Sequence, residues 1–182
     1  MLRHPPPCSL KGDVMTDATD ATEDWDARVA AVWADETLGD DEVIVRIDAL
    51  AGERRQGDAR GLFERAGARD SAGREAEAEP LYRAALEAGL DDSSRAQTVI
   101  QLASTVRNLG RADEAVALLR DELEREPASP LRDEAAAFLA LALVSTGDVR
   151  QAASVALRTL APHLSRYTRS VTFYADELVG DA

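Results

Sequence analysis

The sequence repeats itself with a period of 37 residues, and this period limits the possible folds more than any other feature. Glycines recur at Gly73, Gly110 and Gly147. Three further columns keep the same spacing: Ala66, Ala103 and Ala140; Ala78, Ala115 and Ala152; and Leu86, Leu123 and Leu160. A period of this length is typical of a stacked array in which each repeat is one supersecondary unit.

The residue types in these columns suit a pair of packed helices. A small alanine before each glycine lets a first helix approach its partner closely. The glycine then adopts the left-handed conformation that ends a helix, and the next alanine lies on the contact face of the returning helix. No stretch of useful length alternates apolar and polar residues as a half-buried strand would. The sequence therefore predicts an all-α chain of antiparallel helical hairpins.

These columns resemble the tetratricopeptide repeat family. The second unit matches best, with Ala103, Gly110 to Ala115, Leu119, Leu123 and Pro127 at the separations of that family. The first unit carries Ala66, Gly73, Ala78, Tyr82, Ala85 and Leu86, whereas the third places Ala136 and Ala156 where bulky residues are usual. The family period is about 34 residues, so each unit here is about three residues longer. The resemblance implies a right-handed α-solenoid of three units, at about 58–93, 94–130 and 131–164, that mediates protein–protein interaction.

The segments on either side of the repeats are expected to differ in order. Residues 1–22 contain three consecutive prolines and a Thr-Asp-Ala repeat, which predicts a disordered tail, and Met15 offers an alternative start of translation. Residues 23–57 are expected to form two helices that cover one end of the array, the first with an apolar stripe of Trp25, Val29, Val32 and Trp33. Residues 165–179 are expected to form a C-terminal capping helix whose packed stripe is Tyr167, Val171, Tyr174 and Leu178.

Composition narrows the possible functions. The net charge of −13 repels phosphate backbones and anionic lipid, so neither nucleic acid nor a membrane is an expected partner. One cysteine and two histidines are too few for a disulfide framework or a zinc cluster. No apolar run approaches the ~20 residues of a membrane span, and the N-terminus lacks a secretory signal, which favours a cytoplasmic location. No catalytic constellation is legible and the carboxylates are expected on solvent faces, so the sequence indicates neither an enzyme nor a cofactor.

The resemblance to the family also indicates a binding surface, because first helices of successive hairpins line a concave groove. The positions facing it would be Arg60, Phe63, Asp70, Gln97, Ile100, Ser104 and Arg107. Ile100 fits the core equally well. The lysine and asparagine set with which some members hold the C-terminal carboxylate of a chaperone is missing, although Arg60 and Arg107 are available to a partner's carboxylates. A protein or peptide partner is expected.

One charged segment stands apart from the acidic remainder of the chain. From Val149 to Ala175 there is no Asp or Glu, while four arginines form a basic face: Arg150, Arg158, Arg166 and Arg169. This face could dock an acidic partner, including a second copy in a weak homodimer, but internal pairing with nearby acidic helices is the favoured interpretation. The remaining alternatives are an accessory or regulatory subunit of an enzyme complex and, disfavoured by charge, a nucleic-acid binder.

Overall fold

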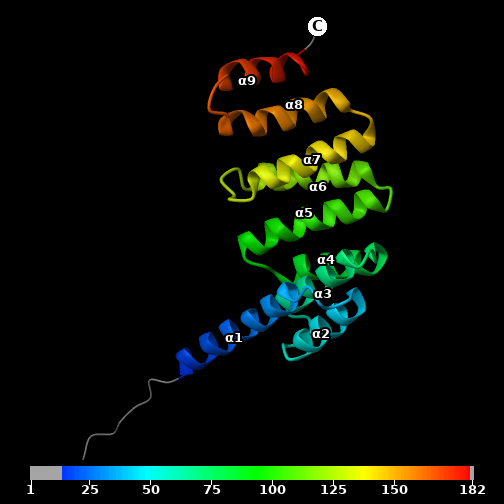
Figure 1. Cartoon of the computed structure of the whole chain (residues 1–182), viewed down its shortest axis with the longest axis vertical. Helices are drawn as coiled ribbons and strands as arrows, with labels where there is room; N and C mark the ends of the chain where they lie inside the picture. The colour runs from blue at the N-terminus through cyan, green and yellow to red at the C-terminus, as the bar shows by residue number, and fades with distance from the viewer. Residues whose placement is uncertain (1–13, 181–182) are drawn as a thin grey trace, which may run out of the picture.

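The computed structural model describes residues 14–180, which form nine α-helices and one 3₁₀ helix stacked along one axis (Figure 1). No strand occurs among these residues, and none of their helices is long and apolar enough to cross a membrane. The helices are α1 (Val14–Ala34), α2 (Asp40–Gly52), α3 (Ala59–Ser71), α4 (Glu75–Ala88), α5 (Asp92–Asn108), α6 (Ala112–Arg125), α7 (Arg132–Thr146), α8 (Val149–Leu160), η1 (Ala161–His163) and α9 (Thr168–Glu177). The all-α prediction is confirmed.

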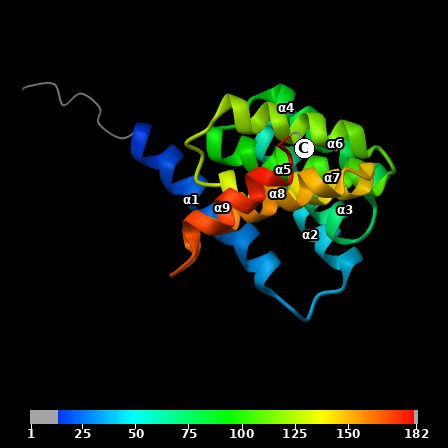
Figure 2. The ribbon, with the colours of Figure 1, turned by 90° about the horizontal axis from the view of Figure 1, so that it is seen from above.

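The repeats form three helical hairpins that stack into a curved array. Helices α3 and α4, α5 and α6, and α7 and α8 pack against each other within the hairpins. The first helices also lie close together across units, α3 with α5 and α5 with α7, whereas the backbones of α4 and α6 are farther apart and are joined by the Arg83–Glu114 ion pair. An array whose first helices lie closer together than its second helices curves around the first row. Helices α3, α5 and α7 therefore line the concave side of the solenoid, and the view along its axis shows the hairpins layered behind one another (Figure 2).

Glycine closes the first helix of each hairpin in the same way. Gly73, Gly110 and Gly147 have φ values of 69°, 84° and 90°. In each case the residue after the glycine donates a backbone hydrogen bond to the carbonyl five residues earlier: Arg74 to Arg69 at 2.8 Å, Arg111 to Val106 at 2.9 Å and Asp148 to Leu143 at 3.0 Å. This bond satisfies a carbonyl that the helix end leaves free. The six column alanines are all buried, as the hairpin contact requires.

We expect Gly110→Val to cost about 1–2 kcal/mol of unfolding free energy, because a β-branched residue is strained in the left-handed conformation. No atom lies within 4 Å of the position that a Cβ would occupy there, so the cost comes from the backbone alone. Gly52→Val is the matched control, since Gly52 is equally open but its φ is not positive. Urea denaturation of both variants tests this. Equal losses would contradict the assigned cap.

In the described part of the chain, the buried apolar side chains form two clusters rather than one continuous core. The larger runs from α3 to α8 and includes Tyr82, Leu102, Val106 and Leu119, each no more than 1% exposed. The smaller joins α1 and α2 to α3 through Trp25, Val29, Ile44, Ile47, Leu50 and Ala68. The N-terminal helices are therefore held by a cluster of their own.

Helix α1 begins within the segment that was expected to be disordered. It starts at Val14, whereas the sequence predicts a disordered tail as far as residue 22, and residues 1–13 lie outside the described part of the chain. The physical reason is cooperativity. The turns around Trp25 and Val29 are buried against α2, and adding residues to an existing helix costs much less than nucleating a new one.

Helix α9 packs on α8 and η1 at the C-terminal end of the array, and only half of the expected stripe lies on its packed side. Ala175 is fully buried, and Val171 and Leu178 are half-buried. Tyr167 and Tyr174, expected on the packed side, are 75% and 61% exposed. Tyr167 precedes the helix in a left-handed conformation, so it is outside the helical phase, and Tyr174 is rotated by about 100° from the buried Ala175.

Candidate protein-binding groove

A pocket of about 620 Å³ opens on the concave side, near the N-terminal end of the array. Three helices that are not consecutive in the chain line it. Helix α1 contributes Asp26, Val29, Ala30 and Trp33; α3 contributes Arg60, Phe63, Glu64, Gly67, Asp70 and Ser71; and α5 contributes Gln97, Gln101, Ser104 and Asn108. Helices α3 and α5 form part of the concave surface that the repeats predict, whereas α1 forms an additional wall.

The structure brings most of the expected groove residues together. Five of the seven line the pocket: Arg60, Phe63, Asp70, Gln97 and Ser104. Ile100 does not, because it is only 6% exposed and packs in the main core, which resolves its alternative interpretations. Arg107 also lies outside the pocket lining, and its Nη2 donates to the side chain of Asn108 at 3.1 Å.

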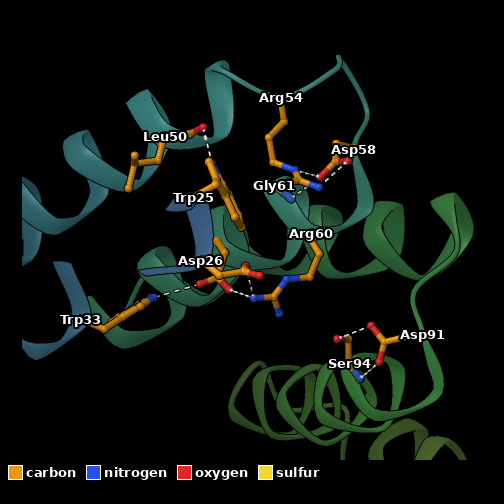
Figure 3. A network of polar contacts seen from close by, with 11 residues as sticks. Trp25, Asp26, Trp33, Leu50, Arg54, Asp58, Arg60, Gly61, Asp91 and Ser94 are labelled. Atoms are coloured by element: carbon orange, nitrogen blue, oxygen red, sulfur yellow. Dashed lines mark hydrogen bonds and ion pairs between the residues drawn. The ribbon is translucent and has the colours of Figure 1, made fainter. Parts of the chain in front are cut away.

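Sequence reasoning missed the contribution of α1 to this pocket. Trp25 is 3% exposed and its Nε1 donates to the Leu50 carbonyl at 2.9 Å. Trp33 is 41% exposed, and its Nε1 instead donates to Glu64 Oε2 at 2.9 Å (Figure 3). Trp33 follows Trp25 by eight residues, which in an α-helix rotates its side chain by about 80° around the helix axis. This rotation was the sequence signal that the two indoles lie on different faces of α1.

An ion-pair network spans the wall between α1 and α3. Arg60 Nη2 lies 3.0 Å from Glu64 Oε1 and 3.4 Å from Asp26 Oδ1, and Figure 3 shows its guanidinium pointing toward the carboxyl group of Asp26. Arg60 therefore already has two internal carboxylate partners. The sequence predicted that Arg60 would be free to bind a carboxylate of the partner, and these internal ion pairs do not fit that prediction.

One carboxyl group in the pocket, that of Glu64, is buried, and a second, that of Asp70, is half-buried. Glu64 is 6% exposed, and burial raises its pKa above the usual value, although the Trp33 hydrogen bond and Arg60 oppose the rise. Burial also raises the pKa of Asp70, which accepts hydrogen bonds from Thr105 Oγ1 at 3.0 Å and Tyr82 Oη at 3.3 Å. The expectation that carboxylates occupy solvent faces is wrong for the buried Glu64 and holds only in part for the half-buried Asp70, because these helix faces turn toward α1 and α5.

The raised pKa of Asp70 predicts a pH dependence of stability. The folded state binds the proton of Asp70 more tightly than the unfolded chain does. Protonation therefore adds to the free energy of unfolding. This gain is complete below the unfolded pKa and is lost as pH rises through the folded pKa. Asparagine has no such titration. We expect the melting temperature of Asp70→Asn, relative to the parent, to fall as pH is lowered from 7 to 4.

Asp58→Asn is the opposing control for this pH series. Burial acts to raise the pKa of Asp58, but hydrogen bonds from Arg54 and the Gly61 amide outweigh burial and lower it. The ionised Asp58 carboxylate stabilises the fold above its unfolded pKa, and this stabilisation is lost in acid. The melting temperature of Asp58→Asn should therefore approach that of the parent as pH falls. Parallel pH trends for the two variants would contradict both assignments.

Glycine at position 67 leaves room in the pocket. A methyl group added there would lie 3.6 Å from Cζ2 of Trp33 and 4.0 Å from the Tyr82 hydroxyl, which are ordinary contact distances. Any longer side chain would extend between these two groups. Gly67, which has no side chain, therefore lies where α1 and α3 meet in the pocket.

Beyond the pocket, the concave surface becomes apolar on α7. The 37-residue period places Leu141 at the position of Ser104 and Val144 at the position of Arg107. Leu141 and Val144 are 48% and 54% exposed. The concave side thus has a polar, acidic pocket toward α1 and an exposed apolar region on α7.

The basic face near the C-terminus is partly paired within the chain. Arg150 Nε donates to the Leu178 carbonyl at 2.9 Å, and Arg158 Nη2 lies 2.6 Å from Asp176 Oδ1. Arg166 and Arg169 form no ion pair with any other residue of the described part. Pairing with an acidic residue, which was the favoured interpretation, is found for Arg158, whereas Arg150 contacts a backbone carbonyl.

Curved stacking of helical hairpins around a concave groove defines an α-solenoid. The family model described as Tetratrico peptide repeat matches residues 59–178 of the chain, so the protein belongs to the tetratricopeptide repeat family. This confirms the resemblance inferred from the repeat columns. Domains of this family generally bind protein partners and are generally non-catalytic. No curated protein and no solved structure matches the chain.

Proposed function

We propose that this protein is a non-catalytic scaffold that holds a segment of a protein partner in its concave groove. The observation that carries the proposal is the pocket of about 620 Å³ between α1, α3 and α5. It lies on the side of the solenoid where first helices are in contact, and it mixes an exposed indole with hydrogen-bonding side chains. Such a combination suits the binding of one or two side chains of a peptide.

The length of the groove suits a short extended segment. Neighbouring helices pack about 8–10 Å apart, so the pocket at α3 and the apolar positions on α7 are about 16–20 Å apart. An extended chain advances about 3.3 Å per residue. A segment of about six residues would therefore reach from the pocket to Leu141 and Val144.

The acidic character of the protein supports a protein partner over nucleic acid. A net charge of −13 opposes phosphate backbones, and two of the four arginines on the basic face have internal partners. A role as an accessory subunit of an enzyme complex, in the cytoplasm, is a particular case of the same binding activity.

Gly67→Leu tests the groove as the binding site. The leucine side chain would fill the pocket, and we expect at least one protein captured from native extract by the parent to be reduced about tenfold with this variant. Ala117→Leu is the matched control, because Ala117 is exposed on α6, away from the concave side. Quantitative mass spectrometry of the captured proteins provides the measurement. Identical sets of proteins on all three baits would refute binding in the groove.

A further inference from the structure

We propose that the concave pocket receives a lysine or arginine side chain of the partner, held between the Asp70 carboxylate and the exposed indole of Trp33. This inference rests on the proposed function and names the chemistry that the pocket selects. It follows from the charges in the pocket, from an acceptor that has no donor, and from the shape of the walls.

The charges that line the pocket are unbalanced. Three carboxyl groups, from Asp26, Glu64 and Asp70, face a single guanidinium, that of Arg60. Arg60 is engaged by Asp26 and Glu64 at 3.4 and 3.0 Å. Asp70 contacts only the hydroxyl groups of Tyr82 and Thr105, so it has no cationic partner among the described residues. A cation from outside would compensate this charge.

Other carboxylates near the same end of the array are compensated from within the chain. Asp48 lies 2.8 Å from Arg69, Asp58 lies 2.6 Å from Arg54 and Glu79 lies 2.9 Å from Arg83. Asp70 is half-buried, and this burial raises the pKa of its carboxyl group. Leaving such a group without a cation is costly, and the cost is recovered when a cation binds.

A second acceptor in the pocket also lacks a donor. The side-chain oxygen Oε1 of Gln101 is buried and has no hydrogen-bond partner among the described residues. Gln101 lies one helical turn before Thr105, the residue that donates to Asp70. The pocket therefore presents two acceptors from adjacent helices. Lysine and arginine end in groups that donate hydrogen bonds and accept none, which matches this demand.

The shape of the pocket adds an aromatic wall. The Cβ position at Gly67 is within 4 Å of both the Trp33 ring and the Tyr82 hydroxyl that donates to Asp70. Gly67 therefore lies between the indole and the hydroxyl that binds the carboxylate, and both Trp33 and Asp70 line the pocket into which the glycine opens. An ammonium or guanidinium group entering there gains the cation–π attraction of the indole in addition to the ion pair.

Selection from a random peptide display library on the immobilised full-length chain tests this assignment. We expect the selected peptides to carry Lys or Arg at one fixed position. A selected peptide is then synthesised, together with a form in which norleucine replaces the basic residue, and both are titrated against the parent, Asp70→Asn and Asp121→Asn. Asp121 is exposed on α6, so its variant removes the same charge outside the pocket.

We expect Asp70→Asn to weaken the basic peptide about tenfold or more, with little effect on the norleucine form and little effect of Asp121→Asn on either. Peptides that bind in the groove, as shown by their loss with Gly67→Leu, but that show no basic preference would overturn this inference and leave the proposed function standing. An equal loss of binding with Asp121→Asn would also overturn it, because general attraction to an acidic protein would then explain the preference. Failure to select any peptide would refute the proposed function and this inference together.

Discussion

Trp25→Ala is expected to release helix α1 from the protein, with a loss of about 3–5 kcal/mol in the local free energy of unfolding. Trp25 is 3% exposed at the centre of the small N-terminal cluster, its Nε1 donates to the Leu50 carbonyl and Arg54 stacks 4.4 Å from its ring centre. Among the described helices, the backbone of α1 lies close to that of α2 alone. Helix α1 also reaches α3 through side chains, since Trp33 donates to Glu64 and Asp26 pairs with Arg60, but neither contact replaces the buried indole.

Hydrogen exchange measures this effect helix by helix. Amides of α1 should lose protection in Trp25→Ala, while those of α5 to α8 keep it, because each unit of a solenoid depends on its neighbours only. Trp33→Ala is the matched control. Trp33 is 41% exposed, so its removal should leave most of the protection of α1. If Trp33→Ala released α1 as strongly as Trp25→Ala, the assignment of Trp25 as the anchor would be wrong.

Arg95→Ala is expected to destabilise the second hairpin by about 3–5 kcal/mol, because it leaves a buried carboxylate without its charge partner. The Glu122 side chain is 3% exposed between α5 and α6, and its Oε2 lies 2.9 Å from Arg95 Nη2. Arg125 is more distant, at 3.9 Å from Oε1, and is 40% exposed. The stability of the hairpin therefore depends on Arg95 far more than on Arg125.

Urea denaturation at pH 7 separates these contributions. Arg125→Ala should cost less than about 1 kcal/mol, as is usual for an exposed ion pair. The double variant Arg95→Met with Glu122→Leu should recover most of the stability lost in Arg95→Ala, because replacing both charges by apolar groups removes the desolvation penalty. Equal losses in Arg95→Ala and Arg125→Ala would show that the short contact carries no special energy.

The repeated part of the fold was legible in the sequence because its determinants are local. The helix-ending conformation of Gly110 depends on a few neighbouring residues, and the burial of Ala103 and Ala115 follows from their spacing around that glycine. Each such signal occurs three times at the same interval, so it stands out from chance. The positions of Arg60 and Ser104 on the concave side follow from the same register.

Contacts that occur only once had no periodic signal. The apolar stripe of α1 indicated a packed helix but not that Trp33 would leave that stripe, reach α3 and donate to Glu64. The acidic residues of α3 and α6 look alike in sequence, and only the packing of α1 and α5 against those helices decided that Glu64 and Glu122 are buried. At the other end, a left-handed residue before α9 shifted Tyr167 out of the expected stripe.

The sequence by itself therefore determined the hairpins, their number and the helices that face the groove, since periodic spacing and glycine conformation act over a few residues. Tertiary structure alone decided what the groove contains. Its acidic pocket exists because α1 lies against α3 and sets Asp26 beside Arg60 and Trp33 beside Glu64, partners more than thirty positions away in the chain. Burial and charge compensation depend on which helices meet, and that outcome is a property of the packed array rather than of any local segment.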